Sequence, residues 1–301
     1  MTSKPRSRRT VNLQILPSAM TVLSICAGLT AIKFALEHQP VPAMTLIAAA
    51  AILDGLDGRV ARILDAQSRM GAEIDSLADA VNFGVTPALV LYVTMLSKWP
   101  VGWMVVLLYA VCVVLRLARF NALQDDGNQP TYAHEFFVGM PAPAGAIFMI
   151  GLLGLKMQFG DHGWWTSVWF LCFWVTGTSI LMVSGLPMKK MHAVAVPPNY
   201  AAALLAVLVI FAWAAWRVPY ILIWVIIIAY VCHIPFAVRQ QRWLAAHPEV
   251  WDDKPKQRRA VRRADRRAQP HRRSMARLGL RKPSGRSMAR LGLRKPGGRV
   301  Q

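Results

Sequence analysis

Long apolar segments separated by short polar stretches make up most of the first 240 residues. Eight of these segments are long enough to cross a membrane as helices. They lie near residues 18–36, 42–64, 71–96, 101–122, 139–158, 165–185, 197–216 and 218–238. Between the last two segments, the apolar sequence is interrupted only by Arg217 and Pro219. The pattern predicts an all-α fold, a polytopic membrane bundle of about eight transmembrane helices.

Four acidic residues interrupt this apolar pattern where the second segment gives way to the third. Asp54 and Asp57 lie near the end of the second segment. Asp75 and Asp79 lie near the start of the third, and a short polar turn at residues 65–69 joins the two. A spacing of three or four residues places both acids of each pair on one helix face. Across a helical hairpin, all four carboxylates would converge on one point.

Converging carboxylates repel one another, but divalent cations between them allow them to stay ionised. Oxygen ligands without nearby His or Cys favour Mg²⁺ or Mn²⁺ over zinc. The four cysteines lie singly in apolar runs, which argues against a zinc site or a disulfide framework. An isolated acid in such a segment could instead pair with an arginine or serve a proton path. Four acids on two matched faces favour a metal site.

The formal net charge of +20 belongs to the two ends of the chain. Residues 254–301 contribute +17 and the first nine residues contribute +4, so the remainder is close to neutral. Lys and Arg also concentrate in alternate loops between the apolar segments, counted with the N-terminus inside. We therefore expect a multi-pass protein of the cell membrane, with both termini and the acidic hairpin on the cytoplasmic side.

The C-terminal tail contains a duplication. Residues 274–286, SMARLGLRKPSGR, recur as residues 287–299 with one difference. A unit with so few apolar residues cannot build a core, so we expect the tail to be disordered. It could contact anionic lipids, or it could act as a solubilising tail that fixes orientation. Because the tail is tethered to the membrane, contact with anionic lipids is favoured. We expect no specific binding of nucleic acid.

The acidic hairpin matches a known family signature, D-G-x₂-A-R-x₈-G-x₃-D-x₃-D, and resembles the CDP-alcohol phosphatidyltransferases. Its seven positions are filled by Asp57, Gly58, Ala61, Arg62, Gly71, Asp75 and Asp79, and Asp54 supplies the upstream acid these enzymes usually carry. The resemblance implies a membrane enzyme that displaces CMP from a CDP-linked lipid with two divalent ions, Mg²⁺ or Mn²⁺. It implies that the four aspartates hold these ions and that Asp79 is also the catalytic general base. It further implies CDP-lipid binding by Gly58, Ala61, Arg62 and Gly71.

Four further blocks resemble membrane-type phosphatidylserine synthases of this family. They are F-G-V-T-P-A at 83–88, R-L-A-R-F-N at 116–121, F-V-G-M-P-A-P-A at 137–144 and L-M-V-S at 181–184. The resemblance covers roughly residues 13–190 and implies CDP-diacylglycerol and L-serine as substrates; we also expect a homodimer. One departure is Pro17-Ser18-Ala-Met-Thr21, which has Ser where these enzymes usually have Asn in P-N-x-x-T.

Arg116, Arg119 and Asn121 are the candidates for serine binding. A planar guanidinium can hold a carboxylate through two hydrogen bonds. Either arginine could instead reach toward lipid head groups or anchor the helix at the inner face. The adjacent Asn121 and the resemblance of the block favour a site role.

We expect four regions along the chain. They are a basic N-terminus at 1–12, a catalytic membrane core at 13–190, two additional helices at 191–245 and the tail at 246–301. Within the same reaction class, glycerol 3-phosphate, inositol phosphate or choline could replace serine as acceptor. An ion-coupled transporter and a scaffold that recruits partners through its tail are the alternatives from other classes.

Overall fold

The computed structural model describes residues 9–66, 68–125, 136–189 and 201–247, together with Trp251 and Val261. The chain divides into two units, Met1–Ala245 and Ala246–Gln301. Residues 1–8 of the expected basic N-terminus and the whole duplication in the tail lie outside the described residues.

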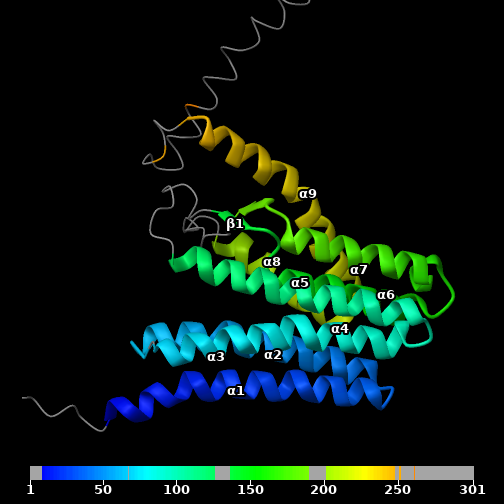
Figure 1. Cartoon of the computed structure of the whole chain (residues 1–301), viewed down its shortest axis with the longest axis horizontal. Helices are drawn as coiled ribbons and strands as arrows, with labels where there is room; N and C mark the ends of the chain where they lie inside the picture. Colours follow the sequence, from blue (N-terminus) through cyan, green and yellow to red (C-terminus); the bar gives the residue numbers. More distant parts are fainter. Residues whose placement is uncertain are drawn as a thin grey trace, which may run out of the picture. The chain divides into compact units, whose positions relative to one another are not determined.

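The described part of the first unit is almost entirely helical, as Figure 1 shows. The α-helices are α1 (Arg9–Leu36), α2 (Pro40–Ile63), α3 (Arg69–Asp79), α4 (Thr86–Leu91), α5 (Pro100–Asp125), α6 (Ala142–Phe159), α7 (Val168–Val183), α8 (Ala201–Arg217) and α9 (Pro219–Ala245). Six helical segments among the described residues are long and apolar enough to span a membrane, while α7 and α8 are shorter apolar helices. Each predicted apolar segment has a helical counterpart. The predicted class, a polytopic helical membrane protein, is confirmed.

The third segment is less regular than the predicted single helix, because α3 and α4 alternate with two π-helical stretches. These are η1 (Ala80–Val85) and η2 (Tyr92–Leu96). Pro87 contributes to the irregularity because it has no N–H to donate to the Phe83 carbonyl four residues earlier. That carbonyl accepts a hydrogen bond from the Tyr109 hydroxyl of α5 at 2.8 Å. Gly84 allows α5 to pack closely, since an added Cβ would lie 3.2 Å from the Val113 side chain.

A short two-stranded ribbon joins the chain before α6 to the chain after α7. Strands β1 (Phe136–Val138) and β2 (Pro187–Lys189) pair antiparallel. The Gly139 N–H donates to the Leu186 carbonyl at 2.9 Å, and Gly139 has a φ of +79°, which favours glycine. This conformation delays the start of α6 to Ala142, three residues later than predicted. The sequence blocks at 137–144 and 181–184 are thereby brought together.

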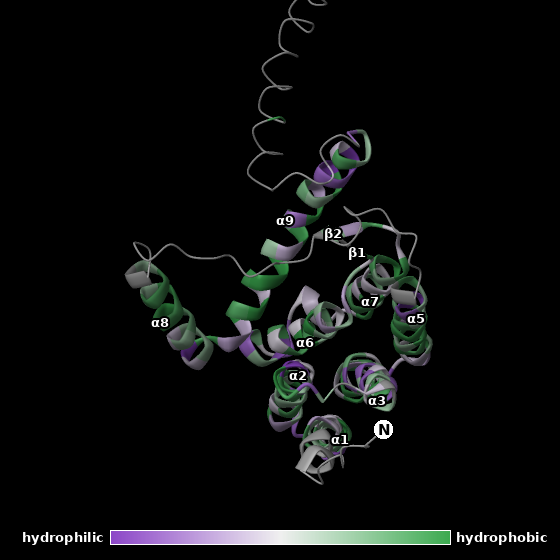
Figure 2. Cartoon of the chain, turned by 90° about the vertical axis from the view of Figure 1, so that its left-hand side faces the viewer, coloured by the Kyte–Doolittle hydropathy of each residue, from purple (hydrophilic) through white to green (hydrophobic). Residues whose placement is uncertain are grey.

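Figure 2 shows most of the helices of the first unit end-on. Helix α1 packs along α2, α5 along α7, and α6 along α9. The buried core draws on α2, η1, α4, α5, α6 and α7. Helix α8 contacts mainly α9, is coloured largely hydrophobic in Figure 2, and exposes nearly all of its described side chains. Such an apolar, exposed helix is typical of a segment that faces lipid.

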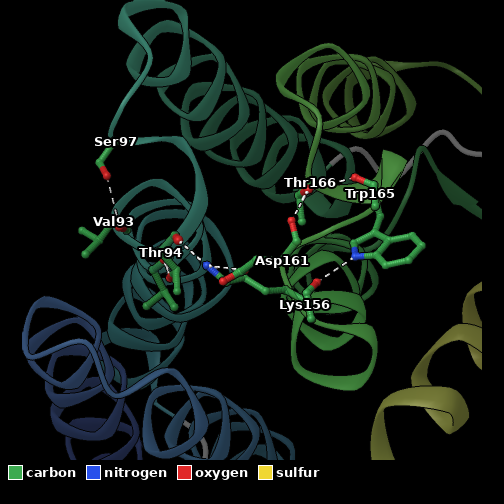
Figure 3. A network of polar contacts seen from close by, with 10 residues as sticks. Val93, Thr94, Ser97, Lys156, Asp161, Trp165 and Thr166 are labelled. Atoms are coloured by element: carbon green, nitrogen blue, oxygen red, sulfur yellow. Dashed lines mark hydrogen bonds and ion pairs between the residues drawn. The ribbon is translucent and has the colours of Figure 1, made fainter.

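A polar network closes the end of α6 that lies farthest from Ala142 (Figure 3). The Lys156 ammonium donates to the Thr94 carbonyl at 3.2 Å and lies 3.2 Å from the Asp161 carboxylate. Thr94 belongs to the last turn of its helical segment, where carbonyls lack helical partners. The Trp165 indole donates to the Gly160 carbonyl at 3.1 Å. These contacts tie α6 to η2 and to the loop that leads to α7.

The contact between α6 and α9 supports a test of the fold. The Trp224 indole of α9 donates to the Gly151 carbonyl at 2.9 Å, and an added Cβ at Gly151 would lie 2.6 Å from Ile227 Cδ1. Gly151→Leu should therefore displace α9 and destabilise the protein by about 1–3 kcal/mol. The measurement is the thermal unfolding midpoint of the purified protein in detergent. Gly177→Leu on α7, where an added Cβ meets nothing within 4 Å, is the control; equal midpoints for both variants would contradict this packing.

Candidate active site

The four aspartates of the hairpin lie together in the structure. Oxygen atoms of Asp54, Asp57 and Asp75 all lie within 4.8 Å of one another. The Asp79 side chain interacts with that of Asp54, and the remaining acids add like charge around it. Helices α2 and α3 thus bring their acidic faces together, as the spacing predicted.

The turn between α2 and α3 is held by local hydrogen bonds. The Ser68 hydroxyl caps α3 by accepting from the Gly71 N–H at 3.0 Å, a frequent role for serine at a helix start. On the α2 side, the Ala66 N–H donates to the Ala61 carbonyl at 2.9 Å. Asp65 takes a positive φ of 51°, which reverses the chain. These contacts set the register in which the two acidic faces meet.

Asp57 is the most tightly held member of the cluster and is only 2% exposed. The Thr21 hydroxyl of α1 donates to its Oδ2 at 2.7 Å, and the Gly58 N–H donates to its Oδ1 at 2.6 Å. Thr21 is itself buried, and its hydroxyl also lies 3.0 Å from the Pro17 carbonyl oxygen. The Pro17–Thr21 motif of the first segment therefore orients an aspartate thirty-six residues away.

A second group of hydrogen bonds links α1 to η1, close to the cluster. The Asn82 amide donates to the Ser24 hydroxyl at 3.0 Å, and that hydroxyl donates to the Thr21 carbonyl at 2.8 Å. Gly28 allows this approach, because an added Cβ would overlap the Asn82 side chain. Ser24 and Asn82 were not among the site residues predicted from the sequence. Their signal was the presence of polar residues inside apolar segments.

A cavity of about 630 Å³ opens beside the aspartates, a size typical of small-molecule sites. Its lining comes from α1, α2, α3 and their connecting turn. The lining residues are Pro17, Ser18, Thr21, Asp57, Gly58, Ala61, Arg62, Ala66, Ser68, Gly71, Ala72 and Asp75. All four residues expected to bind the CDP-lipid are among them. At Gly58 an added Cβ would meet nothing within 4 Å, so this part of the wall is open.

The three candidate serine-binding residues differ in their surroundings. Arg116 is only 7% exposed and interacts electrostatically with Asp79, so its guanidinium faces the protein interior rather than lipid head groups. Arg119 is exposed, and its Nη1 donates to the Val183 carbonyl at 3.3 Å. Asn121 is also exposed, and its amide donates to the Ser76 hydroxyl at 3.1 Å. Arg116 therefore lies beside the acidic cluster, whereas Arg119 and Asn121 contact neighbouring helices.

The donor set of the cluster fits a hard divalent cation. Asp54 Oδ1 is buried and has no hydrogen-bond partner among the described residues, and such an atom is costly unless a ligand reaches it. The two ion pairs of the described residues, Lys33–Glu37 and Lys156–Asp161, lie outside the cluster. All the clustered groups offer carboxylate oxygens, the preferred ligands of Mg²⁺ and Mn²⁺.

Comparison with known proteins agrees with this site. The sequence model described as CDP-alcohol phosphatidyltransferase matches residues 14–159, which extend from α1 to α6. A protein of Mycobacterium bovis named CDP-diacylglycerol–serine O-phosphatidyltransferase is 88% identical over 94% of this chain and 99% of its own length. Proteins of the same name are 74% identical in Mycobacterium leprae, over 94% of both chains, and 35% identical in Bacillus subtilis, over 60% of this chain and 94% of that one. The chain therefore belongs to the CDP-alcohol phosphatidyltransferase family.

Proposed function

We propose that this protein transfers the phosphatidyl group of CDP-diacylglycerol to the hydroxyl of L-serine, which produces phosphatidylserine and CMP. The observation that carries the proposal is the cluster of four aspartates beside a cavity lined by the family signature. Relatives that are 74–88% identical to this chain over 94% of its length carry the name of this activity. Membership of this family leaves no support for the transporter or scaffold alternatives.

The aspartates and the cavity would bind different parts of the lipid nucleotide. Enzymes of this family use a divalent metal. Two Mg²⁺ or Mn²⁺ ions held by Asp54, Asp57, Asp75 and Asp79 would neutralise the pyrophosphate and stabilise the leaving phosphate. Gly58, Ala61, Arg62 and Gly71 would hold the CDP group in the cavity that they line.

The acceptor would approach from the side of Asp79 and Arg116. The serine hydroxyl attacks the phosphorus that carries diacylglycerol, a new O–P bond forms, and the bond from phosphorus to CMP breaks. Asp79 takes up the hydroxyl proton as general base, and its position beside the hydroxyl contributes much of its effect. The buried Arg116 guanidinium binds the serine carboxylate. Arg119 and Asn121 complete this acceptor region through their contacts with α7 and α3.

We also propose that the acidic hairpin faces the cytoplasm, as the distribution of Lys and Arg between the loops favours. In that orientation the acyl chains remain in the bilayer while the nucleotide and serine meet at the aqueous interface. Labelling single-cysteine variants in intact cells with a membrane-impermeant thiol reagent tests this orientation. Labelling at the α2–α3 turn from outside the cell would contradict it.

The proposed reaction leads to three predictions, and the first is that the reaction occurs with purified components. Purified protein supplied with CDP-diacylglycerol, L-serine and Mg²⁺ or Mn²⁺ should form phosphatidylserine and release CMP in equal amounts. Asp75→Asn should abolish turnover while the protein still inserts in the membrane, because it removes a charge from the cluster. Radiolabelled serine and lipid chromatography provide the measurement, with glycerol 3-phosphate, inositol phosphate and choline as competing acceptors. Preference for another acceptor would contradict the assignment, and full turnover in excess chelator would contradict the metal mechanism.

A second prediction isolates the role of Thr21. Thr21→Val removes the hydroxyl that donates to Asp57 and keeps the side-chain volume. Loss of such a partner of a metal ligand commonly lowers metal affinity about 10- to 100-fold, so the Mg²⁺ concentration for half-maximal activity should rise by about this factor. Thr21→Ser should restore it. Thr30→Val is the control, since its hydroxyl donates to the Cys26 carbonyl on the exposed side of α1; an identical metal requirement in all variants would exclude the proposed role.

A third prediction separates the two arginines of α5. Arg116→Gln should raise the KM for serine roughly 10- to 150-fold, the effect of losing a charge-assisted contact of about 1.5–3 kcal/mol. The KM for CDP-diacylglycerol should change far less. Arg119→Gln should have a smaller effect on serine, because that guanidinium already donates to the Val183 carbonyl. Steady-state kinetics with each substrate varied in turn provide the test, and an unchanged serine KM in the Arg116 variant would remove it from the acceptor site.

A further inference from the structure

Two buried polar atoms on α5 and α9 have no hydrogen-bond partner among the described residues. One is Nε of Arg116 on α5, and the other is the hydroxyl of Tyr230 on α9. Native proteins rarely leave such groups unpaired, because each loses its hydration without compensation. Both atoms can donate a hydrogen bond, so a bound acceptor group that reaches them would satisfy both.

The two side chains belong to one electrostatic environment. The Arg116 guanidinium lies within electrostatic range of the Asp79 carboxylate and of the hydroxyls of Tyr230 and Tyr109. The Tyr109 hydroxyl already has a hydrogen-bond partner, because it donates to the Phe83 carbonyl at 2.8 Å. Arg119, one turn farther along α5, donates to a carbonyl at the end of α7. Among these groups, Arg116 Nε and the Tyr230 hydroxyl are the buried donors that have no hydrogen-bond partner among the described residues.

Packing of α9 against α6 holds Tyr230 in place. Its ring meets the Phe148 ring edge to face, with centroids 6.0 Å apart, and Phe148 in turn stacks on Trp174 of α7 at 5.6 Å. Two turns earlier on α9, the Trp224 indole donates to the Gly151 carbonyl of α6. Aromatic contacts of this kind fix the ring but do not satisfy its hydroxyl. The hydroxyl is therefore held in position but has no hydrogen-bond partner in the part of the chain that the structure describes.

We propose that Tyr230 is a second contact for the acceptor carboxylate, and that its hydroxyl and Arg116 together donate hydrogen bonds to the carboxylate of serine. A carboxylate has two oxygens with several lone pairs, so it can accept from both donors at once. Helix α9 lies beyond residues 14–159, the part of the chain that matches the family model. The additional helix would thus contribute to recognition of the acceptor. This inference rests on the proposed use of serine.

The test is the Tyr230→Phe variant, which deletes one oxygen and retains the ring contact with Phe148. The KM for serine should rise about tenfold or more, the effect of removing a hydrogen bond to a charged group. The KM for CDP-diacylglycerol should stay unchanged, and kcat should stay within about twofold because no bond-making group is altered. Tyr220→Phe is the matched control on the same helix, where the ring packs near Gly154 far along α6, and its kinetics should equal those of the wild type.

Each outcome distinguishes the inference from the function on which it rests. Wild-type protein that makes no phosphatidylserine would overturn the function. Wild-type protein that makes it, with an unchanged serine KM in Tyr230→Phe, would overturn the role of Tyr230 alone. A rise in the KM for CDP-diacylglycerol instead would show that the anion beside Tyr230 is a lipid phosphate, which also overturns the proposal.

A measurement on the wild-type enzyme does not depend on the folding of any variant. L-serinamide keeps the hydroxyl and the amine of serine but replaces the carboxylate with a neutral amide. Its kcat/KM should be at least about 100-fold below that of serine. A neutral amide is a poorer acceptor than a carboxylate, so the hydrogen bonds from Arg116 and Tyr230 would be weakened or lost. Equal kcat/KM for the two acceptors would contradict a carboxylate site at Arg116 and Tyr230.

Discussion

The concentration of four carboxylates between α2 and α3, inside a largely apolar helical bundle, is the constraint on which the rest of the structure depends. Like charges at this spacing repel, and apolar surroundings raise the cost further. The protein meets this cost in two ways. Thr21 and the Gly58 N–H satisfy the most buried carboxylate, Asp57. In the proposed mechanism, the remaining oxygens would bind divalent cations that supply the missing positive charge. One of them, Asp54 Oδ1, is buried without a hydrogen-bond partner among the described residues.

Deviations from regular helix serve the same site. The third segment begins as a regular helix carrying Asp75 and Asp79 and then changes to η1 immediately after Asp79. In this irregular stretch the Phe83 carbonyl accepts from Tyr109, and the Asn82 amide reaches Ser24. Short π-helical stretches often occur at functional sites. Here η1 lets one segment carry the acids and also bind α1 and α5 on either side.

The arrangement gives the site two sides with different chemistry. Toward α1 the cavity is lined by small residues and open backbone, which suits a bulky nucleotide. Toward α5 the Arg116 guanidinium and the Tyr230 hydroxyl supply donors from buried positions, which suits a small anionic acceptor. Asp57 and Asp75 line the cavity, and Asp79 interacts electrostatically with Arg116. The proposed transfer of phosphorus would take place beside these aspartates. In the proposed mechanism, different helices would therefore bind the lipid nucleotide and the acceptor, so substitutions should separate the two binding steps kinetically.

The sequence by itself determined the features that depend on local spacing. Apolar length predicted the helical segments, and intervals of three and four residues placed the aspartates of each pair on one helix face, because helical periodicity is a property of neighbouring residues. Only the tertiary structure decided which of Arg116 and Arg119 is buried beside Asp79, since the rotation of α5 depends on packing against other helices. It also decided the contact of Thr21 with Asp57 and the place of Tyr230, more than one hundred residues beyond Arg116. Such pairings are set by the way whole helices pack, which no local pattern encodes.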